Sequence, residues 1–545
     1  MFYLLLSSIF LLPILWGIGE VFSRVFKIVT KEFSWKFIFG IFSLSLVFTG
    51  IAFFAPLNGY VEVATIVIGL SSFFWFKGYL QFWDFFSRQK LSFWFFGGAV
   101  LFFGSFYPFI LDHFGYYVPT VKWISEVGLV KGISNLDLLL GQMSVWHIFQ
   151  AGFSHFSDPF LRMNGIVLLV YLVFIFEKKS WIHLVFLPIL FLFSQSPSTD
   201  LPVIVFSLII LDELFKNNNR TGHLFALSVF VFAIKPTMIW LLLLVFLYLV
   251  FIVKSGFKVI VPGTFILILF FVKNIWTFGF PVFPVQYFDF DFSWKPNADL
   301  LKNSSEIAIM KTYDLQYSID EINKFTHFDH VKNWFLLKGI KGKINIFFIL
   351  TLVAFLVYSL IKKSRLVWIV FVSVLVKSIL VLLFSAQYRF FIDVFFVVFF
   401  VIFYKEISSV YAKLIFVGLS VVLAGFLSFP NFLKTHLPSF QSGSFMGGFK
   451  FAQLYQPSDY EWDQFKTHQI GNLKFNWVDG YIFSFQTPIP AISPGFVQED
   501  LDAGIFPQLK GKTLREGFIW KKINDDEKKQ LQKILVDNLE SGRKQ

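Results

Sequence analysis

The sequence contains no cysteine, and charged residues make up only 15% of its 545 positions. The absence of cysteine excludes disulfide bonds, thiolate nucleophiles and thiolate metal sites, but it neither shows nor excludes an oxidising compartment. Because charge is scarce and 56% of the residues are hydrophobic, the chain has too little polar surface for a water-soluble protein of this size. We therefore expect the lipid bilayer to be its main solvent.

Apolar runs long enough to cross a bilayer recur as far as about residue 428 and then stop. A helix needs about 20 apolar residues to cross about 30 Å of hydrocarbon. We mark fourteen candidate spans, near residues 2–19, 35–55, 62–84, 92–111, 161–176, 181–194, 200–215, 222–234, 237–253, 258–275, 344–361, 365–384, 388–404 and 411–428. The sequence thus predicts an all-α polytopic membrane domain of about 12–14 transmembrane helices over residues 1–428. A small soluble α+β domain is expected over residues 429–545.

Lysine and arginine concentrate in alternate loops between these runs. The basic residues are Arg24, Lys27 and Lys31; Arg88 and Lys90; Lys178 and Lys179; Lys216 and Arg220; Lys254 and Lys258; Lys362, Lys363 and Arg365; and Lys405 and Lys413. The positive-inside rule places these loops in the cytoplasm, and the N-terminus, the segments 112–160 and 277–343 and the tail outside. We expect a multi-pass membrane protein whose N-terminus and C-terminal domain lie outside the cytoplasm. This topology accounts for the net charge of +12, so no nucleic-acid partner is expected.

The two long outer segments have different patterns. Segment 112–160 contains two helical patterns, one beginning at Pro119 and one after Asn135, and both are expected to lie in the membrane interface. Segment 277–343 is polar with interspersed aromatic residues, and it could fold as a lid over the outer face. In the tail, Trp462 and Trp477 either bind an acceptor glycan or form an ordinary small core.

Seven polar side chains near the outer ends of the spans are the candidate site residues. Charges are costly beside hydrocarbon, so those retained there are functional leads in a membrane protein. The candidates are Asp112 and His113 after the fourth span, Asp200 opening the seventh, Lys235 between the eighth and ninth, Lys273 and Asn274 ending the tenth, and Arg389 opening the thirteenth. Simpler explanations stay open, because cations snorkel to headgroups and aspartates cap helices. Lys377, in mid-span, either pairs with a buried carboxylate or tilts outward.

A carboxylate beside several cations at this position suits the transfer of a group from a lipid phosphate. The carboxylate takes the proton of an acceptor hydroxyl as it attacks the anomeric carbon of a sugar, while Arg and Lys stabilise the leaving phosphate. A polyprenyl-phosphate donor in the outer leaflet fits this location, whereas nucleotide sugars are not expected outside the cytoplasm. We find no metal-ligand spacing, so no metal site is predicted and metal dependence stays open.

Two stretches resemble the C-type (GT-C) membrane glycosyltransferases. LDHFGYYVPTVKWISEVGLVKGISNLDLLLGQMSVWHIFQAGF, at 111–153, is similar to their first outer loop, in which an aspartate just outside a span is followed by a Tyr-rich step and two helices separated by a Gly turn. KNIWTFGFPVFP, at 273–284, looks like a later Arg-Asn, Gly, Pro segment with Lys273 where Arg is usual. The nearest resemblance is to a family of bacterial membrane proteins of this kind, of the Bacteroidetes and spirochaete type, over about 110–290 and weakly over 385–395.

The resemblance implies a GT-C-like fold, a place in the bacterial cytoplasmic (inner) membrane with the N-terminus and C-terminal domain periplasmic, and roles for three residues. Asp112 would be the catalytic base, and Lys273 and Arg389 would bind the donor phosphate. His113, Asp200, Lys235 and Asn274 join them as expected substrate-binding residues by location. In the GT-C fold the catalytic aspartate usually follows the first span, whereas Asp112 follows the fourth, so either three helices have been added or the assignment is wrong.

These observations predict a glycosyltransferase that moves a sugar from a polyprenyl-phosphate-linked donor to an extracytoplasmic lipid, glycan or protein acceptor, with inversion. Membrane lipids and the lipid-phosphate sugar donor are the expected partners, and no separate cofactor is predicted. Three alternatives stay open: an enzyme similar to O-antigen ligases or polymerases, a flippase for lipid-linked glycans, and a non-catalytic membrane scaffold. No internal repeat of the kind common in transporters is present.

Overall fold

Helices make up most of the computed structural model, which describes residues 1–545 except 29, 31, 217–220, 437–446, 480, 482 and 543–545. In this part of the chain seven helices are long and apolar enough to cross a membrane: α1 (Phe2–Val25), α2 (Phe33–Ala52), η5–α12–η6 (Pro236–Val253), η7–α13 (Phe257–Phe278), α17 (Ile340–Lys362), α18 (Arg365–Phe384) and α20 (Ser409–Ser428). The prediction of a mostly helical fold is confirmed, and these seven helices support the prediction of a multi-pass membrane protein.

The other seven expected spans are also helical, but they are bent or short. α3 (Gly59–Trp75) and α4 (Gly78–Ser87) meet at 75° and count as an eighth, broken span; Lys77 between them has a left-handed backbone. The short helices are α5 (Leu91–Gly104), α8 (Met163–Lys178), α9 with η4 (Ile182–Phe193), α10 (Asp200–Phe215), α11 (Thr221–Ile234) and α19 (Ile392–Phe403). A helix of 16 residues, such as α8, is about 24 Å long and therefore shorter than the hydrocarbon layer. Neighbouring helices bury α8 and α10 over most of their length.

Glycines allow the first two helices to approach closely. A Cβ on Gly19 would lie 1.7 Å from the backbone oxygen of Lys36, and a Cβ on Gly40 would lie 2.0 Å from that of Leu15. A larger residue at either position would push the helices apart. Across the same contact, the Lys36 ammonium lies 2.5 Å from the Glu20 carboxylate, so α1 and α2 form a fixed pair.

The helices of segment 112–160 are buried inside the protein. In chain order they are η1 (His113–Tyr117, a π-helix), α6 (Val118–Glu126), η2 (Ile133–Asn135), η3 (Leu138–Gln142) and α7 (Val145–Ala151). Trp123 and Trp146, the side chains suited to a headgroup layer, are fully buried, and α7 packs against α2 and α6. The prediction of interfacial helices is therefore wrong, because the apolar faces that were expected to meet lipid meet other helices.

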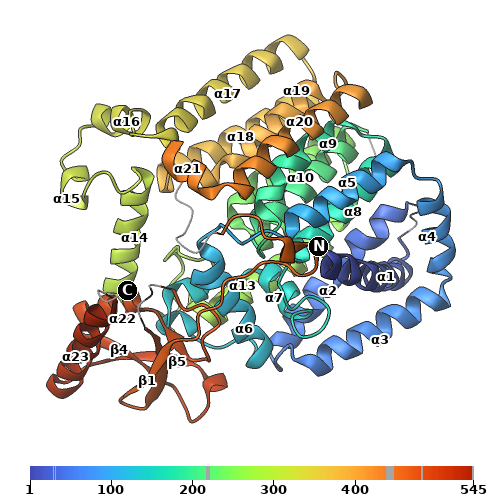
Figure 1. Cartoon of the computed structure of the whole chain (residues 1–545). Helices are drawn as coiled ribbons and strands as arrows, with labels where there is room; N and C mark the ends of the chain where they lie inside the picture. The colour runs from blue at the N-terminus through green and yellow to red at the C-terminus, as the bar shows by residue number, and fades with distance from the viewer. Residues whose placement is uncertain are drawn as a thin grey trace.

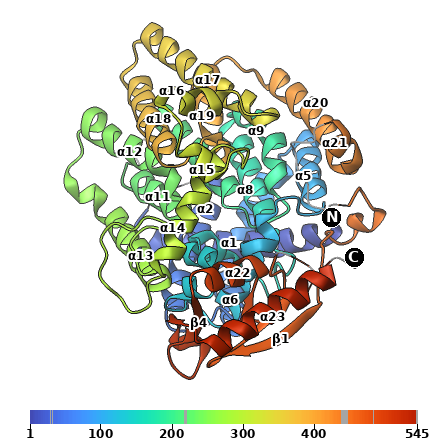
Figure 2. The same cartoon turned by 90° about the vertical axis from the view of Figure 1, so that its left-hand side faces the viewer.

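Three helices form the segment between α13 and α17. They are α14 (Ala298–Thr312), α15 (Ile319–Ile322) and α16 (His327–Phe335). α15 and α16 each begin with a capping box, Ser318 with Glu321 and Thr326 with Asp329, which satisfies the first backbone N–H groups. α14 rises from the C-terminal region towards α15, and α16 lies beside α17 (Figures 1 and 2). The expected role of this segment as a lid stays a prediction.

Short strands and two longer helices form the C-terminal region. After α21 (Pro430–His436) and η9 (Phe451–Leu454), its strands are β1 (Phe465–Ile470), β2 (Leu473–Val478), β3 (Ala491–Ile492), β4 (Ile505–Leu509) and β5 (Phe518–Lys522). β1 and β2 are antiparallel, β3 runs parallel to β2, and β4 pairs antiparallel with β5. Its helices are α22 (Pro494–Asp502), η10 (Leu514–Glu516) and α23 (Asp525–Gly542). The small α+β content expected for the tail is therefore present.

Hydrogen bonds tie this C-terminal region to the helices before residue 428. The Phe518 N–H donates to the Lys131 carbonyl at 2.9 Å, and the Tyr3 N–H donates to the Tyr455 carbonyl at 2.9 Å. The buried Arg162 guanidinium donates to the Ser458 carbonyl at 2.8 Å. The strands and α23 gather at one end of the molecule, away from α17 and α20, in both views (Figures 1 and 2). The region is thus docked along the chain's earlier segments.

Asp137 lies near two acidic residues of α22, Glu499 and Asp500. We therefore predict that the docked C-terminal region is more stable at low pH. Burial raises the pKa of Asp137 to about 7, with a further contribution from Glu499 on α22, and burial also raises the pKa of Asp500. A carboxyl group whose folded pKa is raised stabilises the fold below its unfolded pKa, and this stabilisation is lost as pH rises from about 4 to about 7. For Asp137 the difference is at most about 4 kcal/mol. We expect β4 and β5 to exchange amide hydrogens faster at pH 8 than at pH 5, after correction for intrinsic rates.

Asp137→Asn tests this prediction, because an amide stays neutral at both pH values. The variant should reduce the pH difference in protection, whereas Asp526→Asn, which changes an exposed acid on α23, should preserve it. Equal protection of wild-type β4 and β5 at both pH values would contradict the prediction.

Candidate functional site

Two candidate residues that are 277 positions apart form an ion pair. Asp112 immediately precedes the π-helix η1, and Arg389 lies in η8 (Tyr388–Phe390), the short helix between α18 and α19. Arg389 Nη1 lies 3.3 Å from Asp112 Oδ2. The side chains are 36% exposed for Asp112 and 44% exposed for Arg389, so a ligand can reach both.

A second ion pair adjoins the first. Lys235, in the turn before η5, places its ammonium nitrogen 2.5 Å from Oδ1 of Asp200, the first residue of α10. The same ammonium donates to the backbone carbonyl of Arg389 at 3.4 Å. The structure therefore brings together four of the seven candidates, Asp112, Asp200, Lys235 and Arg389, from four separate parts of the chain.

Two tyrosines that the sequence reasoning did not single out border these pairs. The rings of Tyr116 and Tyr117 lie 4.5 Å apart on η1. Burial, and then the negative charge of Asp112, raises the pKa of Tyr116; burial and the neighbouring Tyr116 do the same for Tyr117. The Tyr116 phenol therefore stays protonated and can donate a hydrogen bond to an oxygen-rich ligand, whereas the buried Tyr117 hydroxyl is hydrogen-bonded to Tyr116. The adjacent YY in the printed sequence, four residues after Asp112, was the available signal.

Lys377 pairs with a carboxylate inside the membrane part. Its ammonium group contacts Asp393 of α19, and the other carboxylate oxygen of Asp393 accepts a 2.7 Å hydrogen bond from the Trp240 indole of α12. Lys377 and Asp393 are almost fully buried. The prediction that Lys377 pairs with a buried carboxylate is confirmed. The pair and the Trp240 indole connect α18, α19 and α12, and Lys377 also interacts electrostatically with Lys235 and Asp200.

Lys273 is buried separately, and it has no carboxylate partner among the residues that the structure describes. Its ammonium donates to the Met143 carbonyl at 2.5 Å. It is linked to Tyr117 only through His147, whose ring lies 4.9 Å from that of Tyr117. Burial and then the charge of Lys273 lower the pKa of His147 to about 3, so this imidazole is neutral. The expected role of Lys273 as a donor-phosphate ligand stays a prediction.

Asn274 and His113 have contacts away from the Asp112–Arg389 pair. The Asn274 amide donates to the Pro281 carbonyl at 2.8 Å and closes the turn after α13, where Gly279 has a left-handed backbone. His113 is buried, with Nε2 3.9 Å from Asp459, and burial and the nearby Arg162 lower its pKa. The Asn274 contact thus positions a backbone segment, and the expected role of both residues in substrate binding stays a prediction.

A family model described as a domain of unknown function (DUF8201) matches residues 1–396, which is more than half of the chain. The chain belongs to this family. The DUF8201 match includes all seven candidate residues and both ion pairs, and it ends within α19, before α20 and the C-terminal region. No curated protein and no solved structure matches the chain. The resemblance to GT-C enzymes therefore stays a prediction for this DUF8201 protein.

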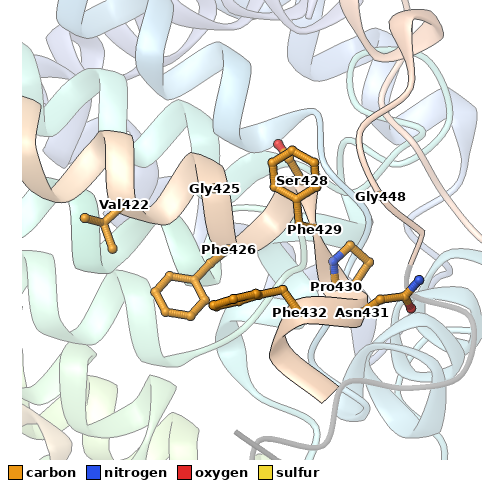
Figure 3. Close-up of a pocket in the computed structure, with 9 residues that line it drawn as sticks. All are labelled: Val422, Gly425, Phe426, Ser428, Phe429, Pro430, Asn431, Phe432 and Gly448. Atoms are coloured by element: carbon orange, nitrogen blue, oxygen red, sulfur yellow. The ribbon is translucent and has the colours of Figure 1, made fainter. Parts of the chain in front are cut away.

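The DUF8201 chain also has an apolar pocket, at the junction of α20 and α21. Its volume is about 650 Å³, and Phe426, Phe429, Pro430 and Phe432 supply most of its wall (Figure 3). None of the seven candidates lines this pocket. Across the described residues, no group of three or more His, Asp or Glu side chains is arranged to hold a metal ion. The apolar pocket and the charged site around Asp112 are therefore separate places in the structure.

Proposed function

We propose that the protein is a membrane glycosyltransferase that moves a sugar from a polyprenyl-phosphate-linked donor to an extracytoplasmic acceptor. In this proposal about 12–14 helices span the bacterial cytoplasmic membrane, and Asp112 and the C-terminal region lie on the periplasmic side. The observation that carries it is the ligand-accessible pair of Asp112 and Arg389, which places a proton acceptor beside a cation.

The pair suits an inverting displacement. The Asp112 carboxylate takes the proton of an acceptor hydroxyl while that oxygen forms a bond to the anomeric carbon of the sugar. The bond from this carbon to the phosphate oxygen breaks, and the phosphate leaves with the electron pair. Arg389 presents several N–H donors to the charge that develops on the leaving group, and Lys235 adds positive charge beside it. The Tyr116 hydroxyl remains protonated and can bind a sugar oxygen.

Binding of the phosphate also changes the state of the base. In the structure Arg389 is engaged with Asp112, so an incoming phosphate competes with the carboxylate for the guanidinium. When Arg389 turns to the phosphate, the Asp112 carboxylate is released from the guanidinium and can accept a hydrogen bond from the acceptor hydroxyl. Binding of the donor phosphate would thus free Asp112 to act as the base.

The first test is whether the purified protein recognises a lipid phosphate. Farnesyl phosphate should stabilise the protein in nanodiscs against heat more strongly than farnesol, which has the same chain without the charge. Arg389→Ala should weaken the binding of farnesyl phosphate by about tenfold or more, the contribution of a charge-assisted hydrogen bond. Affinities are measured from the concentration dependence of the unfolding temperature.

A matched control is available on α4. Arg88 forms an exposed ion pair with Asp84, so Arg88→Ala removes an Arg–Asp pair away from the site and should leave farnesyl phosphate affinity unchanged. If wild type binds farnesol as tightly as farnesyl phosphate, the proposed function loses its anion site. Phosphate-specific binding without sugar transfer to any acceptor would instead favour a transporter of lipid-linked glycans.

A further inference from the structure

Two hydrogen bonds connect helix α14 to the loop that precedes Arg389. The Ser385 hydroxyl donates to the Ala308 carbonyl at 3.1 Å, and the Ala386 N–H donates to the Thr312 hydroxyl at 3.2 Å. Ala308 and Thr312 lie one helical turn apart. Lys311 immediately precedes Thr312, so the last turn of α14 holds Lys311 close to the Arg389 loop.

Helices α16 and α17 also contact the loop that contains Arg389. The Trp334 indole of α16 donates to the Ala386 carbonyl at 2.9 Å, and Phe348 of α17 stacks on Phe391 with ring centroids 4.0 Å apart. The loop is therefore fixed on both sides of Arg389. Because the loop cannot move independently of α14, the spacing between Lys311 and Arg389 is built into the fold.

Lys311 is the cation near this site that has no carboxylate partner. Asp112 already pairs with Arg389, and Asp200 already pairs with Lys235. Lys311 forms no ion pair or hydrogen bond with any residue that the structure describes, yet it interacts electrostatically with Arg389, Asp112 and Glu499 of α22. Its side chain is exposed. The two pairs cancel in charge, so Lys311 adds a positive charge beside them, which Glu499 of α22 partly offsets.

We propose that Lys311 is a further ligand for the phosphoryl group of the substrate, binding an oxygen that Arg389 does not reach. This inference rests on the proposed function and deepens it, because it assigns to the outer segment a direct part in binding the lipid phosphate. Partial burial of its ammonium group, and then the nearby Arg389, lower the pKa of Lys311, and an anion bound between these two cations offsets the second effect.

Charge removal at Lys311 tests the inference with the same probes. Lys311→Met should weaken farnesyl phosphate binding in nanodiscs by about tenfold, as loss of a charge-assisted contact does, and leave farnesol binding unchanged. Lys311→Arg should restore most of the affinity. Lys302→Met is the matched control, because Lys302 is an exposed lysine of α14 that faces Glu306 at 4.0 Å, and it should bind like wild type.

The outcomes separate this inference from the function on which it rests. If Arg389→Ala weakens farnesyl phosphate binding and Lys311→Met does not, the role of Lys311 is overturned while the lipid-phosphate site stands. If wild type itself does not distinguish farnesyl phosphate from farnesol, the proposed function fails. Phosphatidylglycerol in the nanodiscs should not compete with the probe; if it displaces farnesyl phosphate from wild type, Lys311 binds lipid headgroups and the substrate role is overturned.

A pH titration provides a readout that a purely structural role would not affect. The charge of Lys311 is present below its pKa and lost above it, and this pKa is lower than that of an ordinary lysine. The affinity of wild type for farnesyl phosphate should therefore fall as the solution becomes alkaline, with Arg389, Asp112 and Glu499 as the charged groups that set the midpoint. Lys311→Arg should bind without this fall, because arginine does not titrate there. An identical decline in both proteins would overturn the inference.

Discussion

Asp393→Ala is expected to destabilise the protein by about 3–5 kcal/mol, because it leaves the buried Lys377 without its counter-charge. The same change removes the acceptor of the Trp240 indole, so α18, α19 and α12 lose a shared contact. A buried cation without a partner must either neutralise or draw water between the helices. Thermal unfolding in a mild detergent, followed by tryptophan fluorescence, measures the loss.

The double variant Lys377→Met, Asp393→Leu separates charge from packing. Replacement of both members of a buried pair by apolar residues of similar size is often neutral or stabilising. We therefore expect the double variant to recover most of the lost stability. Asp84→Ala, which breaks an exposed pair, should change stability by no more than about 1 kcal/mol. If Asp393→Ala unfolds at the wild-type temperature, the Lys377–Asp393 contact does not stabilise the membrane part.

Asp112→Asn should have the largest effect on activity. An amide cannot take a proton from an acceptor hydroxyl, so we expect transfer to fall by about 10²–10⁴-fold, the usual contribution of general-base catalysis. The amide oxygen can still accept a hydrogen bond from Arg389, and the position is partly exposed, so folding should be preserved. Transfer is assayed in proteoliposomes with a panel of polyprenyl-phosphate-linked sugars and a membrane extract as the source of acceptors.

Asp84→Asn provides the matched control for this experiment. It changes the acid of an exposed Asp–Arg pair on α4, and it should transfer sugar at the wild-type rate. Donor binding by Asp112→Asn should stay within a few-fold of wild type, because the cations remain. A variant at Asp112 that transfers sugar at the wild-type rate would eliminate this residue as the base.

The sequence was sufficient to nominate the core of the site. Asp112, Asp200, Lys235 and Arg389 all lie at helix ends that loop charge assigns to one side of the membrane, so the sequence predicted that they could converge. Lys273 also lies at such an end, but whether a helix end turns towards a cavity or towards another helix depends on packing. Its contact with the Met143 carbonyl comes from segment 112–160, whose fold the sequence did not predict.

Other parts of the molecule carry no sequence signal that could have revealed them. Lys311 lies in a polar helix where lysines are ordinary, and only the hydrogen bonds of Ala308 and Thr312 place it near Arg389. Trp123 and Trp146 have the amphipathic character of headgroup anchors, and their burial is decided by helices from distant parts of the chain. The length of apolar runs likewise cannot distinguish a span from a short helix enclosed by other helices, such as α8.

The hydrogen bond between Arg162 and Ser458 has a consequence for biosynthesis. The two residues are 296 positions apart, and the guanidinium is buried at the start of α8. At about 5–20 residues per second, the ribosome needs roughly 15–60 s after Arg162 emerges to deliver its partner. During that interval the guanidinium has the Phe160 and Gln195 carbonyls as partners but lacks the Ser458 carbonyl. Chains stopped between residues 429 and 457 should therefore be recognised as incomplete by membrane quality control, even though every apolar helix that the structure describes has already been made.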